Sequence, residues 1–145
     1  MPCFIAHSVI SEVDSTENRK LAVVKGLAKS LDLAKIINGE ILVVVPNIQH
    51  LRHGMLSDAL GKDFAAMLAK PTPFNFQGVT ISRSVSNRLP SIINSKTVVW
   101  MVHPQLIDAE AITKSCTTST NIVASEWVPF DELKRWRTHN KAVVI

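Results

Sequence analysis

The sequence predicts a single three-layer α/β domain with a mainly parallel sheet of five to six strands. Strand-like apolar runs alternate with segments of helical periodicity about five times, and a strand-like run ends the chain. Two of the runs, Ile41–Val45 and Thr97–Val102, are apolar at nearly every position, as strands covered by helices on both faces require. A length of 145 residues suits one domain over residues 1–145 with a sizeable core.

The first half of the chain predicts two strands separated by a long helix. Cys3–Ile10 is the first strand, and a helix then begins near Asp14 and ends at Asn38-Gly39, a pair typical of helix C-termini. Apolar residues recur in it at helical spacing, namely Leu21, Val24, Leu27, Ala28, Leu31 and Ala34. The strand Ile41–Val45 follows, and the segment from Ile48 to Ala69 predicts one or two further helices.

The second half continues the same alternation. The expected elements are the strand Val79–Ser82, a short helix near Asn87–Asn94, the strand Thr97–Val102, the helix Gln105–Ser115, the strand Thr120–Ser125, the helix Pro129–His139 and the strand Lys141–Ile145. In the helix Gln105–Ser115 we expect four residues to face inward: Leu106, Ile107, Ala111 and Ile112. A Rossmann-like or flavodoxin-like open sheet fits this count, whereas a closed eightfold barrel needs roughly 200 residues or more.

The net charge of +4 is unevenly distributed. The chain has 16 Lys and Arg against 12 Asp and Glu, and no acidic residue occurs between Phe64 and Ile107. That acid-free stretch holds Lys70, Arg83, Arg88 and Lys96, so the rest of the chain is neutral. A local excess of this kind favours an anionic partner, although buried strands also lack acids. It is too sparse for a duplex DNA binder.

One loop of the acid-free stretch is the strongest candidate for an anion site. Residues 82–88, at a predicted strand end, carry three hydroxyls, one amide and two guanidiniums. Backbone N–H groups at a helix start and arginine side chains suit phosphate or carboxylate. A solvated loop in which a serine caps a helix has the same composition. The candidate residues are Ser82, Arg83, Ser84, Ser86, Asn87 and Arg88.

Three further polar residues stand at predicted strand ends. Asn47 follows the strand Ile41–Val45, while His103 and Glu126 follow the two strands after it. In open parallel sheets, ligands bind beyond the carboxyl ends of the strands. If those last two strands pair, His103 and Glu126 form a histidine–carboxylate pair that could bind a ribose-like hydroxyl or transfer a proton. A histidine before proline is also an ordinary turn residue.

Several enzyme classes lose support because their motifs are missing from the sequence. It contains no Walker loop, no G-x-G-x-x-G after the first strand and no G-x-S-x-G nucleophile elbow. His50 and His53 have helical spacing but no third ligand at a zinc-like spacing, so we expect no metal site. We therefore expect no catalytic residues and favour a binding protein over an enzyme; no cofactor can be named.

The partners and the cellular location follow from the remaining features. The absence of a long apolar run argues against a membrane span, and two cysteines without a leader-like N-terminus lead us to expect a cytoplasmic protein. Trp127, Phe130, Leu133 and Trp136 precede the terminal strand. If that strand is an edge, it could pair with a second copy, although Leu133 and Trp136 also suit an ordinary core.

These observations leave four functional hypotheses. The first is binding of a small phosphate- or carboxylate-bearing ligand, with Arg83 and Arg88 holding the anion and Asn47, His103 and Glu126 orienting it. The second is a homo-oligomeric interaction or structural protein without a catalytic site. The third, which we consider weaker than the first two, is a nucleic-acid accessory protein that uses the stretch Phe64–Ile107. The last is an enzyme of unrecognised type in which His103 and Glu126 form the acid–base pair.

Overall fold

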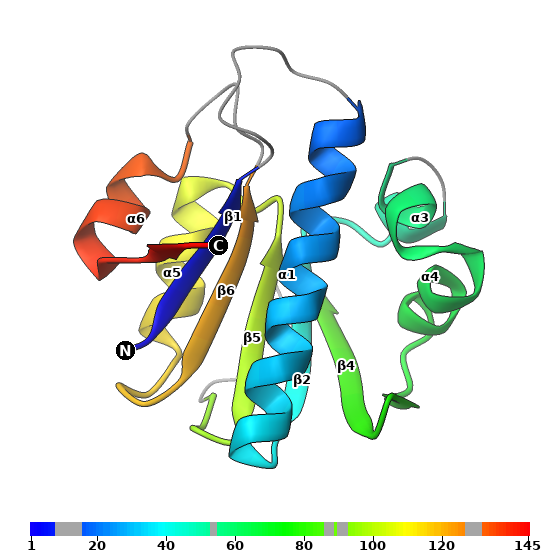
Figure 1. The fold of residues 1–145 in the computed structure, drawn as a ribbon, viewed down its shortest axis with the longest axis horizontal. Coiled ribbons are helices and arrows are strands. Elements are labelled where there is room, and N and C mark those ends of the chain that lie inside the picture. Colours follow the sequence, from blue (N-terminus) through cyan, green and yellow to red (C-terminus); the bar gives the residue numbers. More distant parts are fainter. Residues whose placement is uncertain (8–15, 53–54, 86–88, 90–92, 127–131) are drawn as a thin grey trace.

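A computed structural model describes the chain except for residues 8–15, 53–54, 86–88, 90–92 and 127–131. Within the described residues, seven strands form one sheet in the order β3-β4-β2-β5-β6-β1-β7 (Figure 1). The strands are β1 (Cys3–His7), β2 (Glu40–Val45), β3 (Phe74–Phe76), β4 (Val79–Val85), β5 (Thr97–Val102), β6 (Asn121–Glu126) and β7 (Val143–Val144). All neighbours pair in parallel except β3, which is antiparallel to β4. The α/β class is confirmed, with more strands than the five to six expected.

Helices cover both faces of this sheet. They are α1 (Thr16–Ile37), α2 (Gln49–Arg52), α3 (Met55–Leu60), α4 (Lys62–Ala69), α5 (Leu106–Lys114) and α6 (Lys134–Asn140). One core cluster packs residues of α1 to α4 against Val43 and Trp100, and a second packs α5 and α6 against Leu42 and Val44. Because neighbouring strand residues point to opposite faces, α1 to α4 form one layer and α5 and α6 the other.

The strand order, which the sequence does not predict, differs from both the Rossmann and the flavodoxin order. In both of those orders the first strand lies beside the second. Here β1 lies between β6 and β7, and the sheet places β5 and β6 between β1 and β2. Helix α1 therefore crosses β6 and β5 before the chain enters β2, as Figure 1 shows. Strand pairing between distant segments sets this order, and no local pattern in the sequence reports it.

Helix α1 lies unusually close to the sheet at Gly26. The indole N–H of Trp100 donates to Ser125 Oγ over 2.9 Å, and that hydroxyl donates to the carbonyl of Ala22 over 2.8 Å. A Cβ atom on Gly26 would overlap both Ser125 Oγ and Trp100 Nε1. Gly26 is therefore required by the approach of α1 to β5 and β6.

In two helices the predicted inward stripe is only partly buried: Leu31, Ala34 and Ile112 are buried as expected, whereas other members of the two stripes are exposed. In α1 the small residues Ala22 and Ser30 are buried, while Leu21 and Val24 are 40% and 48% exposed. In α5 the buried residues are Ala109 and Ile112, and Ile107 is 73% exposed, contrary to expectation. Ala111 is exposed as well, and Leu106 is half-buried. In α1, the close approach of the helix to β5 and β6 at Gly26 favours small residues at the contact.

Most element boundaries agree with the expected ones. Thr97–Val102 forms β5, and the predicted run Ile41–Val45 lies within β2. Helix α1 ends where expected, because Asn38 adopts a left-handed conformation with φ 55° and the Gly39 N–H donates to Ala34 O over 2.9 Å. Ile48–Ala69 divides into three short helices rather than one or two. The short helix expected near Asn87–Asn94 lies largely outside the described residues.

No helix of the described part of the chain is long and apolar enough to cross a membrane.

Candidate ligand-binding edge of the sheet

The carboxyl ends of neighbouring strands bring three of the predicted residues to one edge of the sheet. Strands β5 and β6 pair with Val102 opposite Ser125, and the His103 N–H donates to Ser125 O over 2.9 Å. His103 and Glu126 thus follow or end two strands that pair with each other. This pairing is the condition under which the sequence predicted that the two residues lie close together. Asn47 comes two residues after β2, which pairs with β5 on its other side. These three residues therefore end three consecutive strands of the sheet.

A fourth residue, His7, joins this edge from a distant part of the sequence. Strand β1 pairs with β6 in a register that sets His7 opposite Glu126. Glu126 therefore ends β6, and β6 lies between two strands. On one side is β1, which ends at His7, and on the other is β5, which is followed by His103. Although His7 ends the first strand, its relation to Glu126 depends on the pairing of β1 with β6, which the sequence does not reveal.

The edge between β1 and β6 is also a topological switch point. The chain leaves β1 through α1 on one face of the sheet, whereas it leaves β5 and β6 through α5 and α6 on the other. Connections that leave neighbouring strands towards opposite faces open a crevice at their carboxyl ends, where open α/β sheets bind ligands.

The backbone at His103 adopts an uncommon conformation. Its φ is 47°, in the left-handed region, although the next residue is Pro104. Left-handed backbone is uncommon for residues other than glycine and tends to occur at functional sites. This turn directs the chain into α5, whose N-cap Gln105 makes no side-chain capping hydrogen bond. The N-terminus of α5 thus lies immediately after His103.

Glu126 is almost fully buried, with 2% of its surface exposed. Ile122 and Ala124 of the same strand pack in the cluster of α5 and α6, so alternation places Glu126 on that face as well. Removing a carboxylate from water is costly unless neighbouring groups compensate. A buried acid beside two histidine positions at a ligand-binding edge is the main chemical feature of this site.

The predicted anion loop is arranged differently from expectation. Strand β4 continues to Val85, and Ser82, Arg83 and Ser84 lie within it, opposite Leu42 to Val44 of β2, rather than at its end. Pairing with β2, which continues to Val45 opposite Val85, explains this extension. Ser84 is buried, and its hydroxyl donates to Val85 O over 3.3 Å. Ser86, Asn87 and Arg88, the rest of the predicted site, lie outside the described residues.

Arg83 binds the end of a helix. Its Nε donates to Leu68 O and its Nη2 to Ala69 O, both over 2.9 Å, so the guanidinium caps the last carbonyls of α4. Lys96 has a similar role, because its Nζ donates to Ile37 O at the end of α1 over 3.1 Å. Two of the four charges in the acid-free stretch therefore stabilise helix C-termini. Arg83 lies on β4, three strands from Glu126, and does not join His103 and Glu126.

Asn47 has a local structural role as well. Its Oδ1 accepts a hydrogen bond from the Gln49 N–H over 2.8 Å at the start of α2. Asparagine is a favoured residue before a helix for this reason.

The two cysteines have little thiolate at neutral pH. Burial raises the pKa of the Cys3 and Cys116 thiols to about 11 each. The thiolate is the reactive form, so burial makes both thiols weak nucleophiles at neutral pH. Among the described residues, no group of three or more His, Cys, Asp or Glu could hold a metal ion.

Comparison of the chain with models of protein families, with curated proteins and with solved structures found no match.

Proposed function

We propose that the protein binds a small anionic ligand at the carboxyl ends of β2, β5, β6 and β1. The observation that carries this proposal is the burial of Glu126 opposite His7 and beside the end of β5, where His103 lies. The site coincides with the switch point of the sheet, which is the usual ligand position in this class of fold.

The side chains and backbone groups at this edge suggest which part of a ligand each of them would bind. A carboxylate accepts hydrogen bonds from hydroxyls, and a histidine ring can donate or accept one. The backbone N–H groups at the N-terminus of α5 favour a phosphate or carboxylate. Asp108 lies in the first turn of α5 and lowers the positive potential there, so we expect weak binding. A phosphate- or carboxylate-bearing molecule that also presents hydroxyls, such as a sugar phosphate, fits these groups best.

A thermal-shift series with inorganic phosphate, ribose 5-phosphate, a nucleoside monophosphate and citrate tests the proposal. A ligand at 100 times its Kd stabilises the folded state by about 2.7 kcal/mol, which raises the Tm of a chain of this size by roughly 5–10 °C. We expect the sugar phosphates to shift the wild type and to shift Glu126→Gln and His103→Asn much less. Asparagine is chosen at position 103 because it tolerates the left-handed backbone.

The control for this series is Glu40→Gln. It makes the same chemical change on an exposed residue at the first position of β2, the opposite edge of the sheet. For each variant, the Tm with ligand is compared with the Tm of the same variant without ligand. A change in stability caused by the substitution itself is therefore not mistaken for a loss of binding. A wild type that no compound stabilises, or a Glu126→Gln variant that responds as the wild type does, would contradict the proposal.

Homo-oligomerisation is the second candidate, and the edge of the sheet favours it. Strand β7 pairs with β1 on one side and is the last strand of the sheet, with Val143 and Val144 57% and 52% exposed. An exposed apolar edge strand can pair with a second copy. Trp127 and Phe130 lie outside the described residues, whereas Leu133 and Trp136 belong to the core.

Size-exclusion chromatography with light scattering tests this second candidate. We expect a mass of twice 16.0 kDa at high protein concentration if β7 mediates pairing, and a monomer for Val144→Lys. A wild type that elutes as a 16.0 kDa monomer at every concentration would remove this candidate.

A further inference from the structure

A cavity of about 380 Å³ lies between helices α5 and α6, in the layer opposite α1. Its volume is within the range of small-molecule sites in proteins, roughly 300–1,000 Å³. It adjoins the C-terminal half of α5, from Glu110 to Lys114, whereas the carboxyl edge of the sheet lies at the N-terminus of that helix, next to His103. None of the residues that line this cavity belongs to that edge.

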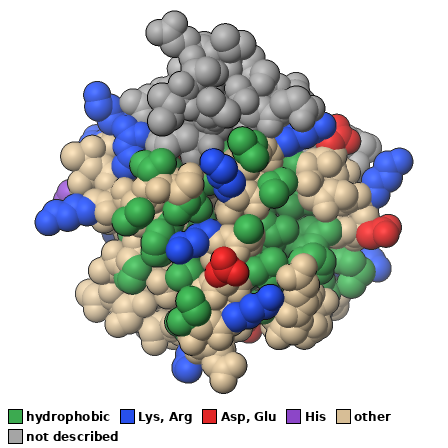
Figure 2. Space-filling model, in the orientation of Figure 1, with side chains coloured by type: hydrophobic (Ala, Val, Ile, Leu, Met, Phe, Trp, Pro, Cys, Tyr) green, Lys and Arg blue, Asp and Glu red, His purple; other side chains and the backbone are tan. Residues whose placement is uncertain are grey.

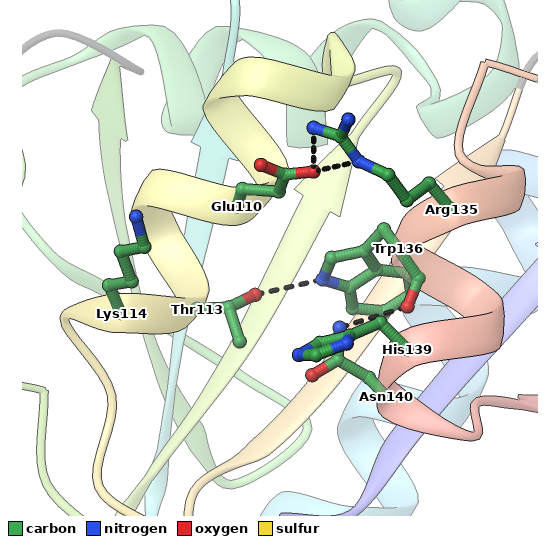
Figure 3. A pocket seen from close by; sticks show the side chains of 7 residues that line it. All are labelled: Glu110, Thr113, Lys114, Arg135, Trp136, His139 and Asn140. Atoms are coloured by element: carbon green, nitrogen blue, oxygen red, sulfur yellow. Dashed lines mark hydrogen bonds and ion pairs between the residues drawn. The ribbon is translucent and has the colours of Figure 1, made fainter.

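The two helices are fixed to each other at the walls of the cavity. The indole N–H of Trp136 donates to Thr113 Oγ over 2.8 Å, and the Trp136 side chain is only 1% exposed. Arg135 donates from Nε and Nη2 to Glu110 Oε1 over 2.8 and 2.6 Å. Figure 3 shows both contacts as links from α5 to α6. The cavity is thus formed before a ligand arrives, which lowers the entropy lost on binding.

The Arg135 guanidinium uses only one oxygen of the Glu110 carboxylate. Both of its hydrogen bonds end at Oε1, and Oε2 accepts no hydrogen bond from the described residues. Figure 3 shows Oε2 on the side of the carboxylate that faces away from Arg135. Each oxygen of an ionised carboxylate has two lone pairs that can accept hydrogen bonds. Glu110 is therefore able to bind a second cation, such as the ammonium group of a ligand.

Lys114 and His139 bring hydrogen-bond donors to the same cavity, one from each helix. Lys114 lies one turn after Glu110 on α5, and His139 lies one turn after Arg135 on α6. Both side chains are exposed, and neither has a hydrogen bond or an ion pair with another described residue. A lysine ammonium has three N–H donors and an imidazole has at least one. These two groups suit a carboxylate, whose oxygens accept several hydrogen bonds at once.

Charge alone does not distinguish this layer from the opposite one. Figure 2 shows the face that carries α1, where Lys and Arg side chains lie among acidic and apolar ones. Exposed lysines occur on both layers, for example Lys62 on α4 and Lys114 on α5. The cavity differs because Glu110 and Lys114 line it together with the side of the buried Trp136 indole. Walls of this composition suit a small ligand that carries both charges and an apolar part.

We propose that this cavity binds the zwitterion of a free amino acid with an apolar side chain. The ammonium group of the amino acid donates to Glu110 Oε2, and its carboxylate accepts from Lys114 and His139. The indole of Trp136 and the methylene groups of Lys114 and Arg135 offer carbon to the rest of the ligand, which favours an aliphatic side chain such as that of leucine. A ligand with only one of the two charges would leave either Glu110 or Lys114 without a partner in the cavity.

The test follows the indole N–H resonance of Trp136 by nuclear magnetic resonance while the full chain is titrated with L-leucine. Trp136→Phe identifies this resonance among those of the three tryptophans. We expect leucine to cause a saturable shift with a Kd in the millimolar range. Leucinamide lacks the carboxylate and N-acetylleucine lacks the ammonium group. We expect each analogue to bind at least about tenfold more weakly than leucine, because each loses hydrogen bonds to a charged side chain.

Two substitutions test the two charges separately. Lys114→Gln should weaken leucine binding about tenfold and leave leucinamide binding unchanged, because leucinamide has no carboxylate for Lys114 to bind. Glu110→Gln should weaken leucine binding and leave N-acetylleucine binding unchanged. The matched controls are Lys62→Gln on α4 and Glu40→Gln on β2, which make the same chemical changes at exposed positions away from the cavity. We expect both controls to bind leucine within about twofold of the wild type, because distant sites act independently.

No saturable shift with leucine would overturn the proposal, as would equal affinities for leucine and its two analogues, because the contact would then be apolar only. Equal losses for Lys114→Gln and Lys62→Gln would also overturn it. Lys114→Gln decides the matter even if Glu110→Gln displaces α6, because the Lys114 side chain has no bond to a described residue. We expect the thermal shift with sugar phosphates to be the same for Lys114→Gln as for the wild type, so this proposal and the proposed function fail separately.

Discussion

Replacing Gly26 with alanine is expected to lower the free energy of unfolding by about 2–3 kcal/mol. The added Cβ would overlap Ser125 Oγ and Trp100 Nε1, which are joined by a buried hydrogen bond of 2.9 Å. Overpacking a close-packed core costs typically 1–3 kcal/mol, and a buried hydrogen bond left unmade adds about 1–3 kcal/mol. Alanine recovers about 1 kcal/mol because it favours the helix more than glycine does. Urea unfolding followed by far-UV circular dichroism measures the difference.

The control for Gly26→Ala is Ala28→Gly, which exchanges the same two residues at an exposed position of the same helix. We expect Ala28→Gly to cost about 1 kcal/mol, the difference in helix propensity alone. The two substitutions change helix propensity in opposite directions, and yet both are expected to destabilise. If Gly26→Ala proved as stable as the wild type or more stable, α1 would not approach β5 and β6 as closely as described.

The same contact explains why the buried face of α1 could not be predicted from hydrophobic spacing. Leu21 and Val24 have the period of an inward stripe, but the helix lies on β5 and β6 through Ala22, Gly26 and Ser30. A helix that crosses two strands closely needs small residues at the contact. Periodicity weighs large apolar side chains, and it therefore misplaces Leu21 and Val24 while it places Leu31 and Ala34 correctly. The strands were predicted more accurately, because a strand buried on both faces must be apolar throughout.

Some features of the candidate site could likewise be predicted from the local sequence, whereas others depend on contacts between distant parts of the chain. The positions of His103 and Glu126 at strand ends could be predicted, because His103-Pro104 stops one apolar run and Glu126 follows another. The position of His7 opposite Glu126 depends on β1 entering the sheet beside β6. The role of Arg83 depends on carbonyls fourteen and fifteen residues away along the chain. Such partners are set by tertiary structure, and an arginine that caps a helix looks the same in the sequence as one that binds an anion.

Replacing Trp136 with alanine is expected to lower the free energy of unfolding by about 4 kcal/mol. The side chain is 1% exposed and packs in the cluster that α5 and α6 share with the sheet, and truncating a buried tryptophan typically costs 3–5 kcal/mol. The loss is a large fraction of the 5–15 kcal/mol that stabilises an ordinary domain. Chemical unfolding followed by far-UV circular dichroism is the appropriate measurement, because tryptophan fluorescence itself would change with the substitution.

Two milder substitutions separate the packing of Trp136 from its hydrogen bond. Trp136→Phe keeps most of the apolar contact, and Thr113 Oγ still donates to Ala109 O over 2.7 Å, so we expect a cost of about 1–2 kcal/mol. Thr113→Val leaves the indole N–H buried without its acceptor and should cost about 1–3 kcal/mol. The double variant should cost less than the sum of the two, because the unpaired N–H is then absent. If Trp136→Ala left the main unfolding transition unchanged and increased only the proteolysis of the C-terminal segment, α6 would be a loosely attached helix.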